Sequence, residues 1–288
     1  MGWSLGGIRK PNIETLEEEI LSTSGCFETQ LLNKLKLLDF GQGWEIVKKV
    51  MPDLEKRQTR DLVRLMFSDK VEELIELLKD RTERLEVIEC LGYIPARKTV
   101  EILASLLVNK DSNVQLVAAG ALKNHTPRLV VPYIVELLLK SEVAPSRAGE
   151  VLLEMDFLAR EELFKAYDLA KPKVKGQILE ILTASNDPKC KKFINSALLS
   201  EEVLLKRAAL TAVEKFVFKD LWLEVAICLT DPIWQIRAKA LEVLARLGVK
   251  DASELVTPFL DDVDPWVQKG AKDCLEVLNS VDEERVNE

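Results

Sequence analysis

A nine-residue helical pattern recurs along this chain, and its spacing constrains the fold more than any other feature. Copies begin at Val114, Val174, Leu205, Ile236 and Val267, with intervals of 60, 31, 31 and 31 residues. Each copy has an apolar residue first, an Ala or Ile four residues later and an apolar residue eight residues later. These positions form one stripe along a helix of 3.6 residues per turn. The pattern therefore predicts a repeat of amphipathic helices.

Two more copies fit the same register, because the interval of 60 residues holds one at Ala144 and a weaker one begins at Glu83. We call the helices with this pattern second helices. First helices are expected between them, at 71–78, 99–108, 129–139, 162–169, 191–199, 222–229 and 253–260. Each first and second helix would form a hairpin that has to stack on its neighbours to bury its apolar faces.

The ends of the helices carry their own signals. Asp187, Asp231 and Asp264 each precede a proline, which predicts a capping side chain followed by the first helical turn. Pro258 falls inside an expected first helix and should kink it. With only 12 glycines and 11 prolines, the chain has too few turn residues for a sheet protein of this length.

The repeat register divides the chain into three parts. About seven repeats occupy residues 68–279, residues 1–67 form an atypical N-terminal helical capping segment, and residues 280–288 form a C-terminal tail. Gly41-Gln42-Gly43 is expected to make a flexible joint in the capping segment. Residues 1–66 hold ten basic and ten acidic side chains, so the repeats carry the whole net charge of −8.

Two segments resemble a known repeat family. Residues 231–245 read DPIWQIRAKALEVLA and residues 262–271 read DVDPWVQKGA, with an acidic turn, an apolar residue, Arg or Gln, and then small residues. This pattern resembles the HEAT-repeat family, including the bacterial subgroup of bilin-lyase-like HEAT repeats. The resemblance implies an all-α, right-handed α-α superhelix, a HEAT-like solenoid of the armadillo-like helical class. Such solenoids mostly serve as binding scaffolds.

The residues that many enzymes need are scarce. His125 is the only histidine and follows an expected second helix, where it should interact with terminal carbonyls. No phosphate-binding glycine loop or nucleophile elbow is present, so we expect no metal, no cofactor and no catalytic residue. Five scattered cysteines, including Cys26, and no leader or membrane span predict a cytoplasmic protein without membrane association.

An enzymatic alternative comes from the resemblance. HEAT-like alkylpurine DNA glycosylases use tryptophans and an aspartate, and Trp222, Trp234, Trp266 and Asp231 invite that comparison. Trp234 and Trp266, however, are expected in turns, where they either staple helix entries or stay exposed as anchors. DNA binding also needs a basic surface, and the repeats are acidic. A glycosylase-like or bilin-lyase-like enzyme is therefore the alternative, and we expect no nucleic-acid partner.

Positions along each second helix are numbered here as offsets from the first stripe residue. Offsets two, six and nine point away from the stripe, which in HEAT-like solenoids is toward the concave surface. Offset six is acidic in five of seven repeats, and offset nine adds Glu214. The predicted partner-binding residues are Glu89, Glu150, Glu180, Glu214, Glu242, Asp273, Trp234 and Trp266.

Three further expectations concern neighbouring rows. Basic residues at offset one, such as Lys206 and Arg237, should neutralise part of the acidic row. The apolar residues at offset five should pack between successive second helices as far as Lys272, where the row breaks. Small groups should leave a shallow trough at Gly120, Ser146, Gly149 and Gly176.

These features predict a non-enzymatic protein-interaction scaffold. Its concave acidic groove is expected to bind a basic or amphipathic protein segment. The alternative is that this face is an ordinary solvent-exposed helical surface without a binding role. Its charge pairs would then each stabilise the helix by about 0.3–0.5 kcal/mol. The oligomeric state is left open.

Overall fold

Helices form all the regular structure in the described part of the chain, as the sequence predicts. The computed structural model describes residues 12–23, 27–80 and 84–286, with side chains as far as residue 280. The expected positions of Cys26 and Glu83 lie outside these ranges. Two compact units divide the chain, the N-terminal unit Met1–Ile134 and the C-terminal unit Val135–Glu288. No helix in the described ranges is both long and apolar enough to cross a membrane.

The N-terminal unit begins with four helices ahead of the first hairpins. Its α-helices are α1 (Ile13–Ser22), α2 (Thr29–Lys36), α3 (Phe40–Val50), α4 (Lys56–Phe67), α5 (Val71–Leu77), α6 (Arg84–Leu91), α7 (Arg97–Leu106) and α8 (Ser112–Leu122). Short 3-10 helices follow α3 and α4, namely η1 (Met51–Asp53) and η2 (Ser68–Lys70). Helix α9 (Pro127–Leu139) crosses the boundary between the units.

The C-terminal unit alternates first and second helices. Its α-helices are α10 (Pro145–Leu153), α11 (Asp156–Leu169), α12 (Pro172–Ala184), α13 (Lys191–Leu198), α14 (Val203–Phe216), α15 (Trp222–Ile227), α16 (Trp234–Leu247), α17 (Ser253–Val256) and α18 (Pro265–Val286). The 3-10 helices are η3 (Pro188–Cys190), η4 (Lys219–Leu221), η5 (Cys228–Thr230), η6 (Lys250–Ala252) and η7 (Thr257–Asp261). Because α18 continues to Val286, helix extends into the segment expected to be a tail.

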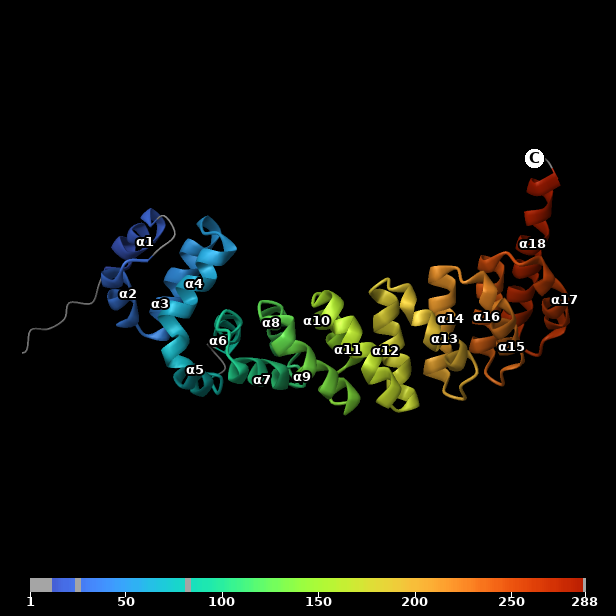
Figure 1. Cartoon of the computed structure of the whole chain (residues 1–288), viewed down its shortest axis with the longest axis horizontal. Coiled ribbons are helices and arrows are strands. Elements are labelled where there is room, and N and C mark those ends of the chain that lie inside the picture. Colours follow the sequence, from blue (N-terminus) through green and yellow to red (C-terminus); the bar gives the residue numbers. More distant parts are fainter. Residues whose placement is uncertain (1–11, 24–26, 81–83, 287–288) are drawn as a thin grey trace, which may run out of the picture. The chain divides into compact units, whose positions relative to one another are not determined.

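Second helices stack on one another within each unit. In the C-terminal unit α10, α12, α14, α16 and α18 make successive contacts, and each of α12 to α18 also packs on the first helix before it (Figure 1). In the N-terminal unit α6 contacts α8, and the hairpins α5/α6 and α7/α8 have the same arrangement. The chain is therefore an all-α solenoid. The proposed limits of the capping segment, repeats and tail stay predictions.

The predicted stripe forms the core of the hairpins. Ile178, Leu182, Ala240 and Leu244 have no exposed surface, which holds for most stripe positions of the described second helices. Ala144 is an exception, since it is exposed as the N-cap of α10. The burial of large aliphatic side chains in this row provides the main stabilisation of each hairpin, at about 25 cal/mol per Å² of apolar surface.

The glycine-rich segment near residue 41 is not the flexible joint that the sequence predicts. Asp39 caps α3 by accepting from the backbone N–H of Gln42 at 2.9 Å, so all three residues lie in the first turns of a helix. A Cβ at Gly43 would lie 3.0 Å from the Phe67 ring. Gly43 therefore permits α3 to approach α4 closely, beside an aromatic core of Phe40, Trp44 and Phe67.

The predicted capping aspartates accept backbone hydrogen bonds. Asp187 and Asp264 each accept from the N–H two residues later at 2.9 Å. Asp231 does the same for Ile233, but α16 begins only at Trp234. Pro258 does more than kink its helix, because α17 ends at Val256 and η7 follows. Without a backbone N–H, proline cannot continue the α-helical bonding.

Candidate functional site

The rows of the second helices separate into a packed side and an open side. All offset-five residues from Ile88 to Leu241 are buried, whereas Lys272 is exposed. Two contacts in the C-terminal unit lie between second helices. A Cβ at Gly149 on α10 would lie 3.3 Å from Ile181 on α12. A Cβ at Gly270 on α18 would lie 3.4 Å from the offset-five residue Leu241 on α16. The prediction that this row packs between second helices is confirmed.

The side chains at offset six face solvent in most of the described repeats. Glu89, Glu180, Glu242 and Asp273 are exposed, and Glu150 is half-buried. Partial burial raises the pKa of Glu89, while Lys48 opposes that rise. The predicted acidic residues thus lie on the surface in both units, and whether they bind a partner stays a prediction.

The bases that pair with these acids are not those expected at offset one. Glu180 on α12 pairs with Arg207 on α14 at 3.3 Å. Lys239 on α16 pairs with both Glu214 on α14, at 2.7 Å, and Glu242 on its own helix, at 2.9 Å. Burial alone would lower the pKa of Lys239, but its hydrogen bonds to the two carboxylates have the larger combined effect and raise that pKa above its ordinary value. Glu150 pairs with Arg147 within α10.

Offset-one residues instead connect second helices to the turns beside them. Lys206 pairs with Asp231, and Arg237 pairs with Asp262 through bonds of 2.9 and 2.7 Å. In both cases the acid lies in the turn that leads to the next second helix. These hydrogen bonds raise the pKa of Arg237. The expectation that offset one neutralises the acidic row is therefore wrong for these two bases.

The same offset also fixes the turn that precedes its own helix. Four side chains donate to the carbonyl six residues earlier, at 2.6–3.0 Å, and these donors are Arg84, Gln115, Arg237 and Gln268. The bond from Arg237 to the Asp231 carbonyl is buried, and a buried carbonyl without a partner costs about 1–3 kcal/mol. These bonds to preceding carbonyls were not predicted from the sequence, because helical periodicity does not locate the carbonyl that each side chain reaches.

A hollow of about 560 Å³ opens between α14 and α16. Its walls come from offsets −2, two and six on both helices: Val203, Arg207, Thr211, Trp234, Ala238 and Glu242. The hollow brings together two predicted partner-binding residues, Trp234 and Glu242. Arg207, Thr211 and Lys239 also line it, and none of these three was predicted to bind a partner.

The two tryptophans expected in turns occupy the first helical turns of α16 and α18. Trp234 is 37% exposed and lines the hollow, whereas Trp266 is 66% exposed. An aromatic side chain that staples a helix entry would be largely buried against it. The exposure of Trp266 therefore contradicts the staple interpretation for that residue.

The expected trough of small residues is only partly open. Nothing lies within 4 Å of a Cβ placed at Gly120, and Ser146 is exposed. Gly149 and Gly176, however, are buried against the next second helix. In the N-terminal unit offset two also presents Leu85 and Leu116 as exposed apolar side chains.

Two residues weighed for a catalytic role, Asp231 and His125, are buried. The Asp231 side chain is 3% exposed, pairs with Lys206 and caps the start of the next helix segment. His125 follows the end of α8 as expected but is buried, and neither ring nitrogen makes a hydrogen bond of ordinary geometry to the terminal carbonyls of that helix. Burial lowers the pKa of His125, and the nearby Leu91 carbonyl opposes that change. Within the described ranges no cluster of three or more His, Cys, Asp or Glu side chains could hold a metal.

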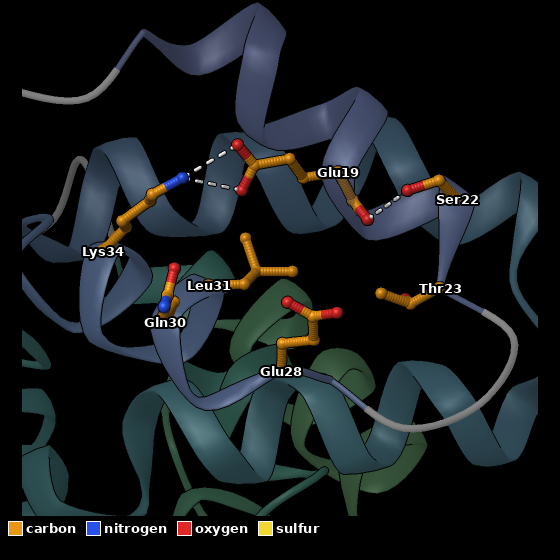
Figure 2. Close-up of a pocket in the computed structure, with 7 residues that line it drawn as sticks. All are labelled: Glu19, Ser22, Thr23, Glu28, Gln30, Leu31 and Lys34. Carbon is orange, nitrogen blue, oxygen red and sulfur yellow. Dashed lines mark hydrogen bonds and ion pairs between the residues drawn. The ribbon is translucent and has the colours of Figure 1, made fainter.

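A smaller hollow of about 240 Å³ lies between α1 and α2 (Figure 2). Glu19 and Lys34 face each other across it and form two hydrogen bonds of 2.8 and 2.9 Å. Glu28 and Thr23 complete a polar lining around Leu31. The charges of Glu19 and Lys34 are satisfied by each other, and no predicted partner-binding residue lines this hollow.

Comparisons with known proteins support the repeat architecture. The family model for HEAT repeats matches residues 71–152, which span the hairpins from α5/α6 to α9/α10. The resemblance to HEAT repeats is thereby confirmed for this segment, while the bilin-lyase-like subgroup stays a prediction. No curated protein sequence matches the chain.

Several solved structures are similar in fold. Kap121p is 11% identical with a TM-score of 0.54 over 92% of this chain and 37% of its own. An engineered protein is 19% identical with a TM-score of 0.39, covering 93% of this chain and 88% of its own. Human deoxyhypusine hydroxylase, in complex with glycerol, is 14% identical with a TM-score of 0.33, covering 93% of this chain and 96% of its own. Only the likeness to Kap121p has a TM-score above 0.5 among these three, and it supports the solenoid fold alone.

Proposed function

We propose that this chain is a non-enzymatic protein-interaction scaffold that binds a basic or amphipathic protein segment. The binding surface is the open face of α12, α14 and α16, where the acidic row adjoins the hollow beside Trp234, and it continues onto α10 through Glu150. The observation that carries the proposal is this juxtaposition of exposed carboxylates and a partly exposed tryptophan. Aromatic anchors beside charged groups are typical of protein interfaces.

Charge on this face favours a basic partner. Glu180, Glu214 and Glu242 outnumber Arg207 and Lys239 by three to two, and one lysine serves two carboxylates. Attraction between exposed charges acts over a Debye length of about 8–10 Å in physiological salt. Neighbouring second helices, packed about 10 Å apart, can therefore attract one segment together and speed its association.

The non-enzymatic interpretation draws support from the side chains that an enzyme would need. Asp231 is committed to Lys206 and to a helix cap, which leaves it unsuited to contact a nucleobase. The acidic open face also disfavours phosphate backbones. A glycosylase-like or bilin-lyase-like activity is the alternative, and turnover of an alkylated oligonucleotide or a bilin by the purified chain would support it.

A charge-reversed variant tests the binding surface. Glu150, Glu180 and Glu242 are changed together to Lys. A partner is first captured from cells with the wild-type chain, and its affinity for both purified chains is then measured at several salt concentrations. We expect the variant to bind its basic partner more weakly and with a shallower salt dependence, because long-range attraction is lost. Equal affinity and an equal salt slope would mean that this face is not the binding surface.

The matched control changes three acids on other surfaces of the C-terminal unit, Glu162, Asp220 and Glu224, to Lys. Glu162 and Asp220 also take part in exposed ion pairs, so the control alters the net charge by the same amount and breaks comparable contacts. We expect it to bind as wild type does. A loss as large as that of the first variant would indicate a net-charge effect and would contradict the proposal.

A further inference from the structure

The hollow beside Trp234 has an apolar end and an acidic end. Val203 and Trp234 stand at offset −2 of α14 and α16, and Glu242 stands at offset six of α16. Residues four apart on one helix face are separated by about 6 Å along the axis. Ala238 lies midway between Trp234 and Glu242, and its small side chain leaves the space between them open.

The acidic end has acceptor capacity that its single cation does not use. Lys239 holds Glu214 at 2.7 Å and Glu242 at 2.9 Å, so two carboxylates share one ammonium group. The Glu214 side chain is 27% exposed, whereas that of Glu242 is 62% exposed. Glu242 is therefore the carboxylate that can turn toward a second cation while Lys239 stays with Glu214.

We propose that this hollow holds one arginine side chain of the bound segment, stacked on Trp234 and paired with Glu242. The inference rests on the proposed function, because it assumes that a basic segment binds this face. The guanidinium group lies over Ala238, where it contacts the Trp234 ring on one side and donates hydrogen bonds to the Glu242 carboxylate on the other.

Arginine fits this arrangement better than the other charged side chains. A planar guanidinium stacks on an indole face and donates two parallel hydrogen bonds to a carboxylate, whereas a lysine ammonium does neither. An acidic side chain would have to displace Glu180 from Arg207 or a carboxylate from Lys239. The three carboxylates and two basic groups of this face would also repel an acidic side chain.

The test uses small probes and the whole chain. The indole N–H signal of Trp234, identified by its loss in Trp234→Phe, is followed by NMR while N-acetyl-arginine amide is added. N-acetyl-citrulline amide, which has nearly the same shape without the charge, and N-acetyl-glutamate amide are added to separate samples. We expect only the arginine probe to move the signal in a saturable way.

Two variants locate the effect. Glu242→Gln should weaken binding of the arginine probe by about tenfold, or ~1.4 kcal/mol. Asp273→Asn, at the same offset on α18 and outside the hollow, should leave the affinity unchanged. Equal movement with citrulline, stronger binding of glutamate, or no saturable movement with arginine would each overturn the assignment.

This outcome is separable from the test of the proposed function. If the arginine probe fails while the Glu150, Glu180 and Glu242 reversal still abolishes partner binding, the arginine assignment is wrong and the scaffold proposal stands. If the reversal has no effect on the partner, the proposed binding face fails whatever the probes do.

Discussion

A single methyl group added at Gly176 should push two second helices apart. A Cβ built there would lie 2.9 Å from the backbone nitrogen of Leu205 and 3.0 Å from the carbonyl carbon of Leu204. Ordinary contacts begin near 3.4 Å, and both neighbours are backbone atoms that cannot rotate away. Gly176→Ala therefore requires α12 and α14 to separate by about 0.5 Å, against the close packing of a protein core.

The same substitution at Gly120 provides the control, since nothing lies within 4 Å of a Cβ there. Replacing glycine by alanine inside a helix favours folding by about 1 kcal/mol. Overpacking costs about 1–3 kcal/mol, and only Gly176→Ala incurs it. Both variants gain about the same free energy from the helix propensity of alanine. The Gly176→Ala variant should therefore be about 1–3 kcal/mol less stable than the Gly120→Ala variant.

Urea denaturation followed by circular dichroism measures this difference as a shift in the free energy of unfolding. The shift should occur without a change in the slope of that free energy against urea concentration. Equal stabilisation by both substitutions would refute the close approach of α12 to α14. Because Glu180 on α12 pairs with Arg207 on α14, the separation should also weaken this part of the candidate site.

Three other changes test separate parts of the structure. Leu182→Asp should destabilise the chain by several kcal/mol, because it buries an unpaired charge at a fully buried stripe position, and unchanged thermal stability would show the register to be wrong. Arg237→Met should cost about 1–3 kcal/mol in urea titrations, because Asp262 loses its charged partner and the Asp231 carbonyl loses its side-chain donor, and the double change with Asp262→Asn should recover part of that loss. Burial lowers the pKa of His125 in the folded chain, so its contribution to stability is complete above the unfolded pKa of about 6.5 and is lost as the pH falls below it. His125→Leu should make the melting temperature less dependent on pH between about 7.5 and 5, and an unchanged dependence would show that this histidine does not control it.

The sequence predicted those features that depend on one helix at a time. Helical periodicity was enough to separate the buried stripe and the buried offset-five row from the exposed offset-six row. The capping aspartates were also predictable, because their hydrogen bonds reach only two residues along the chain.

Features that depend on the register between hairpins were missed. Lys239 and Glu214 lie 25 residues apart, and so do Lys206 and Asp231, with a partner on the adjacent hairpin in each case. The periodicity of a single helix predicts the direction in which a side chain points. It does not predict the axial position of that side chain relative to the residues of the next helix. The hollow beside Trp234 depends on that axial position. Gly43 was misread for a related reason, since only the approach of Phe67 explains why a glycine lies in α3.

The offset-one bonds have a consequence for how the C-terminal unit opens. Lys206 ties α14 to the turn before α16, and Arg237 ties α16 to the turn before α18. Local loss of one hairpin would therefore break an ion pair with its neighbour and expose the apolar stacking face of that neighbour, which makes opening in the middle of the stack costly. Stacked repeats coupled in this way unfold as a block rather than one by one. Amide hydrogens of α14 and α16 should then exchange with solvent together, at a common rate set by opening of the block.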